Sequence, residues 1–177
     1  MNKAKRQDFA VKAFEIFYQK NKDFSLILVF RTPEDSESID YFNSIKRYIE
    51  EKHLPVKFRI DLKNDEIISL YAKCYACLFC ARDEDFGLVP LEGMASFKPV
   101  ISVNEGGPKE TILDNITGFL VNNEIEMAEK MDLLANNPDL AKSMGENGRK
   151  HVEKNFDDKI FIEKFKKIVK EKLDIEL

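Results

Sequence analysis

Two acidic residues in the segment DEDFGLVPLEGMA could act together, because Glu84 and Glu92 stand eight positions apart around a Phe-Gly turn. Carboxylates accept hydrogen bonds from hydroxyl groups, and Gly87 between them removes a side chain where a backbone must approach a ligand closely. Pro90 suits the first turn of a helix, so we expect a helix from about Leu88. The free N–H groups and positive dipole end of that helix favour a phosphate just outside it. The two carboxylates are therefore expected to flank an anion site whose ligand carries hydroxyls on both sides of a phosphate.

Three cysteines have the spacing C-x-x-C-x-x-C, which can bind an iron–sulfur cluster. The residues between Cys74, Cys77 and Cys80 are mostly apolar and indicate a buried strand. Side chains alternate along a strand, so Cys77 and Cys80 are expected on opposite sides, where they cannot bind one metal ion. We therefore interpret the cysteines as core residues and expect no metal site. An odd number of thiols fits a reducing compartment.

The composition narrows the class of protein. A chain of 177 residues, 44% of them hydrophobic, is expected to form one domain with a single core. Its 28 basic and 32 acidic residues give a net charge of −4, which argues against general nucleic-acid binding because there is no basic excess to neutralise phosphates. No apolar run reaches the ~18 residues that span a membrane, and the start MNKAKRQDF lacks a secretory signal. We expect a cytoplasmic location.

Helical and strand patterns alternate along the chain, and these elements must position the acidic pair. Short apolar runs predict buried strands at 25–30, 56–60, 76–80 and 99–103. Apolar residues at helical spacing predict helices over 7–20, 36–51 and 65–73, the last with Asn64 as N-cap, and over most of the chain beyond GFLV. This alternation is typical of βαβ units with right-handed crossovers. We expect one α/β domain, residues 1–177, with a doubly wound parallel sheet and a helical C-terminal tail.

The acidic pair follows the predicted strand that ends at Cys80, and ligands of open parallel sheets bind beyond the carboxyl ends of the strands. Five ordered blocks of the chain then resemble a known family: E-x7-E at Glu84 and Glu92, EDFGLVPLEGMA, KPVIS, EGGPKETI and TGFLV. They resemble the carboxyl-terminal domain of the retaining glycosyltransferases of group 1 (family 4), which have two Rossmann-like domains in the GT-B fold. The NEGGPKET variant looks most like mannosyltransferases of lipid or polysaccharide pathways. The resemblance implies a Rossmann-like half of a GT-B enzyme, with helices on both faces of its sheet.

The resemblance also implies roles for single residues. Glu84 matches the glutamate that contacts donor-sugar hydroxyls, and Glu92 matches the one that binds the nucleotide ribose. Lys5 falls where the family has the lysine of an Arg and Lys pair that neutralises the diphosphate; the partner arginine would precede the first residue here. Gly106 and Gly107 are expected to offer N–H groups beside the phosphate. Four consecutive residues match backbone contacts to sugar and diphosphate: Phe86, Gly87, Leu88 and Val89.

Each of these residues also has an interpretation that needs no ligand. Glu84 could be a solvated loop acid, Glu92 an acid that stabilises the helix dipole, and Lys5 an ordinary surface cation. NEGGP could be only a turn. The apolar stripe on the last predicted helix is interpreted as helical core or as a face that contacts another domain, with a membrane-surface helix as a further alternative. This stripe consists of Phe161, Phe165, Ile168 and Val169.

The sequence departs from the family pattern at two positions. Phe97 stands where a glycine usually precedes Lys-Pro, and Gly93 replaces the usual alanine. Neither change removes a ligand group, but glycine inside a helix costs about 1 kcal/mol relative to alanine. The larger departure is length, because the family's acceptor-binding amino-terminal domain has no counterpart here. We interpret the chain as a donor-binding domain excised from a longer two-domain enzyme.

The function expected from the resemblance is that of a retaining hexosyltransferase, with the isolated chain inactive. Lys5 and the helix amides from Leu88 would stabilise charge on the leaving diphosphate, and Glu84 would contact the sugar, so Glu84 and Lys5 are the catalytic candidates. No metal and no cofactor are required. Hydrolysis by Glu84 and Glu92 acting as a carboxylate pair is not expected, because that mechanism needs both carboxyls to face one glycosidic bond. Here one of the two would face the ribose.

The partners implied are a nucleotide-sugar donor, with GDP-mannose as a guess from the NEGGPKET variant, and a glycan or lipid-linked acceptor held by the missing domain. A non-catalytic nucleotide-binding or regulatory module of the same fold is the alternative, since fold alone does not determine function. A sugar-nucleotide epimerase of related architecture is a third interpretation. For the full-length enzyme, a peripheral position at the inner face of the membrane is an alternative to a purely cytoplasmic one.

Overall fold

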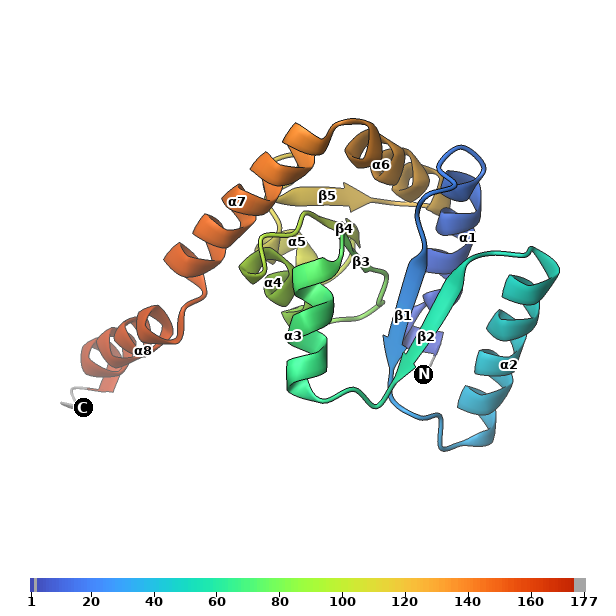
Figure 1. Cartoon of the computed structure of the whole chain (residues 1–177). Helices are drawn as coiled ribbons and strands as arrows, with labels where there is room; N and C mark the ends of the chain where they lie inside the picture. The colour runs from blue at the N-terminus through green and yellow to red at the C-terminus, as the bar shows by residue number, and fades with distance from the viewer. Residues whose placement is uncertain (2, 174–177) are drawn as a thin grey trace.

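Parallel strands and the helices that cover them make up the chain (Figure 1), in a computed structural model that describes residue 1 and residues 3–173. The strands are β1 (Leu26–Phe30), β2 (Val56–Ile60), β3 (Cys77–Phe79), β4 (Val100–Val103) and β5 (Gly118–Val121). The helices are η1 (Lys3–Lys5), α1 (Gln7–Tyr18), α2 (Ser36–Glu51), α3 (Asn64–Lys73), α4 (Leu88–Ala95), α5 (Pro108–Thr111), α6 (Glu124–Asn136), α7 (Pro138–Asn155) and α8 (Asp158–Leu173).

The hydrogen bonds divide the strands between two parallel sheets. β1 pairs with β2, with Leu26 opposite Val56, and β4 lies between β3 and β5, with Val100 opposite both Cys77 and Gly118. The parallel strands expected from the sequence therefore form two hydrogen-bonded sheets. A sequence pattern predicts strands but not the hydrogen bonds between them, and β3 is only three residues long. The α/β class and the parallel strand direction are confirmed.

Helix α1 joins the two sheets through side chains. Its residues Phe9, Ala10 and Ala13 pack in the core cluster over β3–β5, and Val11, Phe14 and Phe17 pack in the cluster over β1–β2. Leu78 of β3 and Met131 of α6 contact both clusters. Because one helix is buried on two sides, the two sheets share a continuous apolar core.

Helices lie on both faces of the β3–β5 sheet, as expected. α1 and α6 cover one face, and α4 and α7 pack on the other around Leu91, Met94 and Val100. The close approach of α7 to the turn after α4 needs a glycine, because a Cβ atom at Gly145 would lie 2.2 Å from the carbonyl oxygen of Phe97.

Most predicted element bounds agree with the structure, with differences at the ends. Helix α1 ends at Tyr18, and β1 begins at Leu26. The predicted N-cap of α3 is corrected: Asn64 is its first residue and Lys63 takes the N-cap position. The reason lies one turn later, where the Glu66 carboxylate accepts a hydrogen bond from the Lys63 backbone N–H at 2.9 Å.

Helix α8 extends away from the sheets beyond α7 (Figure 1). Phe165 and Ile168 are 52% and 57% exposed, so the prediction that this stripe is buried core is wrong for these two residues. The side chain of Phe161 lies outside what the structure describes. The alternative of a face that contacts another domain stays a prediction. Among the described residues, no helix is both long enough and apolar enough to cross a membrane.

Candidate functional site

The candidate site lies at the carboxyl ends of β3 and β4, where two loops meet. The loop from Cys80 to Gly87 follows β3 and contains Glu84, and the NEGGP loop follows β4. The Gly107 N–H donates a hydrogen bond to the carbonyl oxygen of Glu84 at 2.8 Å. The two loops are therefore in direct backbone contact.

Both glycines of the NEGGP loop are required by this contact. A Cβ atom at Gly106 would lie 2.5 Å from the Glu84 carbonyl oxygen, and one at Gly107 would lie 2.5 Å from the Cα atom of Phe86. Gly106 also has a φ of +59°, which favours glycine. The prediction that Gly107 offers its amide to a phosphate is corrected, because that amide is already bonded to Glu84. For Gly106 the phosphate role stays a prediction.

Lys5 and Glu84 come together although 79 positions separate them in the chain. The Lys5 Nζ atom donates to the Glu84 Oε2 atom at 2.7 Å, and the side chains are 51% and 27% exposed. The structure thus brings Lys5 and Glu84 together, and their shared role in one binding site stays a prediction. An ammonium group and a carboxylate side by side can bind, respectively, the phosphate and the hydroxyls of one ligand.

Helix α4 begins at Leu88, as predicted, and its amino end faces the same loops. Its N-cap is Gly87, with a left-handed φ of 81° and no side-chain cap, and its first turn contains no acidic residue. The positive end of the helix dipole is therefore not compensated within the helix. The side chains of Phe86, Leu88 and Val89 are all exposed, so any role they have in binding is through the backbone or through apolar contact.

Glu92 lies on the surface of α4, and its partner comes from another helix. The Tyr71 hydroxyl of α3 donates to the Glu92 Oε2 atom at 2.9 Å. Glu84 and Glu92 thus differ in their surroundings, because one bonds a cation and the other a neutral phenol. The sequence pattern predicted both acids but did not predict Tyr71.

Three further charged residues around the site were also missed. Arg6 is the N-cap residue of α1 and has a left-handed φ of 48°, and its Nη1 atom lies 3.2 Å from Oε1 of Glu105 in the NEGGP loop. Arg82 donates its backbone N–H to the Ala4 carbonyl oxygen at 2.8 Å. These contacts fix the segment that carries Lys5 against both loops. They span 78 and 99 positions in sequence, so no local pattern could have indicated them.

The cysteines lie as the strand pattern predicted. Cys77 packs against Gly93 of α4, and the Cys80 thiol lies 3.9 Å from the Met127 sulfur of α6, on the opposite face of the sheet. Burial raises the pKa of Cys80 to about 12. Within residues 1 and 3–173, no three His, Cys, Asp or Glu side chains are grouped as metal ligands would be.

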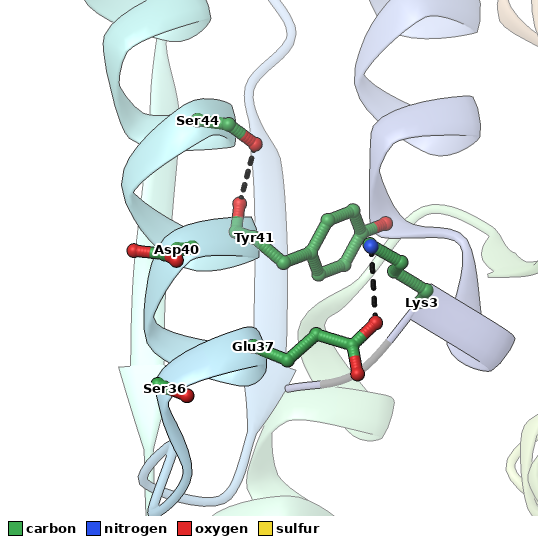
Figure 2. A pocket seen from close by; sticks show the side chains of 6 residues that line it. All are labelled: Lys3, Ser36, Glu37, Asp40, Tyr41 and Ser44. Atoms are coloured by element: carbon green, nitrogen blue, oxygen red, sulfur yellow. Dashed lines mark hydrogen bonds and ion pairs between the residues drawn. The ribbon is translucent and has the colours of Figure 1, made fainter.

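Two hollows on the surface lie away from Glu84 and Glu92. One, of about 390 Å³, lies between η1 and the start of α2, and Figure 2 shows Lys3 and Glu37 facing each other across it. The other, of about 400 Å³, lies beside α3 and includes Arg59 and Lys73. Neither is lined by Glu84 or Glu92.

Comparison with known proteins agrees with this arrangement. The family model described as glycosyl transferases group 1 matches residues 1–151. The alpha-1,3/1,6-mannosyltransferase ALG2 of Dictyostelium discoideum is 34% identical over 175 residues, in an alignment that covers 91% of this chain and 41% of that protein. This chain thus spans less than half the length of that relative.

Two solved structures have the same fold. The C-terminal domain of LpcC, a glycosyl transferase group 1 family protein of Francisella tularensis, aligns with a TM-score of 0.81 and 23% identity over 89% of this chain and 83% of that one. Anabaena HepE, in complex with UDP-glucose, aligns with a TM-score of 0.86 and 22% identity over 97% of this chain and 46% of that one. The fold is therefore that of a Rossmann-like half of a GT-B protein. Because the family model matches most of its length, this chain belongs to the glycosyl transferases of group 1.

Proposed function

We propose that this chain is the donor-binding domain of a glycosyltransferase and that it binds a nucleotide-sugar at the edge formed by Lys5, Glu84 and the amino end of α4. The observation that carries the proposal is the convergence of a cation from the start of the chain with a carboxylate and an uncapped helix end that belong to one distant segment. A nucleotide-sugar has the matching groups, since it carries a diphosphate between two sets of hydroxyls.

Each residue has one role in this proposal. Lys5 and the first amides of α4 bind the diphosphate, Glu84 accepts from sugar hydroxyls, and Glu92 accepts from the ribose. When the bond to the anomeric carbon breaks, negative charge develops on the leaving diphosphate, and a fixed cation and fixed amides stabilise that charge without reorganising. A metal is not needed for this step.

We further propose that the donor is GDP-mannose and that the sugar is transferred with retention of configuration. The support is the NEGGPKET segment and the 34% identity to a mannosyltransferase. The HepE complex contains UDP-glucose, so a uridine donor is the competing possibility. The acceptor, a glycan or a lipid-linked sugar, would be held by a second domain, and this chain alone would bind nucleotide without transferring sugar.

Calorimetric titration of the chain with GDP, UDP and ADP tests donor binding. We expect binding of one nucleotide in preference to the others, with GDP first, and binding of none would refute the proposal. Glu92→Gln should weaken that binding by about 1.5–3 kcal/mol, the range for a hydrogen bond to a charged group. Glu129→Gln, which changes an exposed acid on α6, is the matched control and should leave affinity unchanged.

A further inference from the structure

The hydroxyl group of Tyr71 bonds Glu92, the residue proposed to bind the ribose of the ligand. We propose that Tyr71 is a positioning residue, whose hydroxyl holds the Glu92 carboxylate in the orientation that accepts hydrogen bonds from the nucleotide ribose. This inference rests on the proposed function of Glu92 and adds a residue to it. Tyr71 lies on α3 and Glu92 on α4, so the bond also joins two separate helices.

The direction of the hydrogen bond determines what the carboxylate can do next. The pKa of Tyr71 is raised far above its usual value, first by burial and then by the neighbouring Cys77 and Glu92, so the phenol stays protonated and donates. An ionised carboxylate only accepts hydrogen bonds, and it has two oxygens. Tyr71 bonds Oε2 at 2.9 Å, so Oε1 and the remaining lone pairs can accept from a vicinal diol, whose hydroxyls donate.

The surroundings of the two side chains explain why a positioning residue is needed. Glu92 is exposed on a helix surface, where a glutamate side chain has several rotamers of similar energy. Tyr71 is only partly exposed, and its ring is held in part by burial. A mobile carboxylate bonded to a less mobile phenol loses part of its freedom before the ligand arrives, which favours binding.

The test removes the hydroxyl while keeping the ring. GDP and UDP are first compared, and the nucleotide that binds the wild-type chain is used. The affinities of the wild-type chain and of Tyr71→Phe are then measured for that nucleotide and for its 2′,3′-dideoxy counterpart. We expect Tyr71→Phe to lower affinity for the parent nucleotide about three- to tenfold, as for loss of one ordinary hydrogen bond. Affinity for the dideoxy nucleotide should change less than about twofold, because that ligand has no ribose diol for Glu92 to accept from.

Tyr75→Phe is the matched control. The Tyr75 hydroxyl donates to the backbone carbonyl of Leu134 at 2.8 Å, four positions from Tyr71 in sequence but away from Glu92. A tyrosine hydroxyl with a purely structural role should affect both nucleotides equally or neither. We therefore expect Tyr75→Phe to leave the ratio of the two affinities unchanged.

The possible outcomes separate this inference from the proposed function. If the wild-type chain binds parent and dideoxy nucleotides equally, the ribose role of Glu92 is wrong. If the wild-type chain discriminates but Tyr71→Phe weakens both nucleotides by the same factor, Tyr71 is structural and only the present inference is overturned. The double variant Tyr71→Phe with Glu92→Gln gives a second measurement. If Tyr71 acts only through Glu92, the double variant should prefer the parent nucleotide over its dideoxy counterpart no less than Glu92→Gln alone does. If the two single substitutions each reduce this preference and their reductions multiply in the double variant, a role exerted through Glu92 is contradicted.

Discussion

At the scale of residues, the ion pair between Lys5 and Glu84 is the feature on which most of the proposed chemistry depends. Its Nζ–Oε2 distance is 2.7 Å, yet half of the lysine side chain is exposed, so the pair is partly screened by solvent. A diphosphate has more negative charge than one carboxylate and can share the ammonium group with Glu84. The pair therefore keeps Lys5 at the edge of the sheet without preventing it from binding an anion.

Replacing Lys5 tests its role in binding the diphosphate. We expect Lys5→Met to lower nucleoside diphosphate affinity by about 1 kcal/mol, less than a fully buried charged hydrogen bond because the group is half exposed. Lys3→Met is the control, since Lys3 pairs with Glu37 at 3.0 Å and lies two positions away. Calorimetry should show a change within about 0.5 kcal/mol for Lys3→Met. Equal effects of the two variants would remove Lys5 from the site.

The residues that sequence reasoning identified differ in kind from those it missed. Glu84, Gly87 and Glu92 belong to one contiguous segment, whose spacing around a helix start is visible in the sequence. Tyr71 and Glu105 act through contacts between elements, Tyr71–Glu92 and Arg6–Glu105, and such contacts depend on how the elements pack. The amide of Gly107 was assigned to a phosphate because a sequence does not show that a neighbouring loop already uses it.

At the scale of elements, local pattern predicted the helices and strands but not how the strands pair. Apolar periodicity identified β1, β2 and β4 because their side chains enter a core. Helix α1 contributes residues to both core clusters, and its helical periodicity does not show which of its residues joins which cluster. The turn after α4 is a second example. The sequence shows Phe97 where the family has a glycine, but it does not show the backbone conformation of that residue.

Phe97 has a φ of 60°, in the left-handed region that favours glycine. Its ring lies 5.5 Å from the Arg149 guanidinium, which also donates to the Ala95 carbonyl at 2.7 Å. We expect Phe97→Gly to be more stable than Phe97→Ala by about 1 kcal/mol, because both variants lack the ring and only alanine keeps the strain. Chemical denaturation gives the difference.

Ser96 provides the comparison for Phe97. It has an ordinary φ of −93°, so Ser96→Gly should be less stable than Ser96→Ala. If alanine is at least as stable as glycine at position 97, the backbone strain inferred there does not contribute to stability.

The contact between α1 and α2 predicts a dependence of stability on pH. Glu15 of α1 accepts from the Tyr48 hydroxyl and lies 3.0 Å from the Lys52 Nζ atom. The Tyr48 hydrogen bond is the main cause that lowers the pKa of Glu15. A lowered carboxylate pKa stabilises the fold above the usual glutamate pKa of about 4.3, and this contribution is lost as the pH falls through the lower folded value.

Glu15→Gln should therefore destabilise the chain by about 1 kcal/mol at pH 7, the size of one partly exposed charged hydrogen bond. The difference from the wild-type chain should shrink as the pH falls below about 4. Thermal unfolding between pH 3 and pH 7 measures this difference in stability. Glu51→Gln, which changes an exposed acid on α2, is the control. A difference that does not depend on pH would show that Glu15 acts through packing instead of charge.

At the scale of the whole molecule, the two sheets are held together by side chains, and α1 is shared between them. The cluster over β1–β2 contains Phe14, whose ring centroid lies 6.0 Å from that of Phe17 and 5.6 Å from that of Tyr18. The cluster over β3–β5 contains Phe9, Ala13 and Cys80. Since successive residues of one helix enter different clusters, neither sheet can lose α1 without exposing both cores.

Phe14→Ala tests whether the molecule unfolds as one unit. Phe14 is 1% exposed, so the truncation should cost about 3–5 kcal/mol. Its effect should reach Cys80, which belongs to the other cluster and whose raised pKa keeps the thiol unreactive while it is buried. We expect β1–β2 amide exchange and Cys80 labelling to accelerate by the same factor. Ile68→Ala, at a position on α3 that is 67% exposed, should change neither rate. Faster amide exchange with unchanged Cys80 labelling would mean that the sheet formed by β1 and β2 opens by itself and that α1 does not couple the two cores.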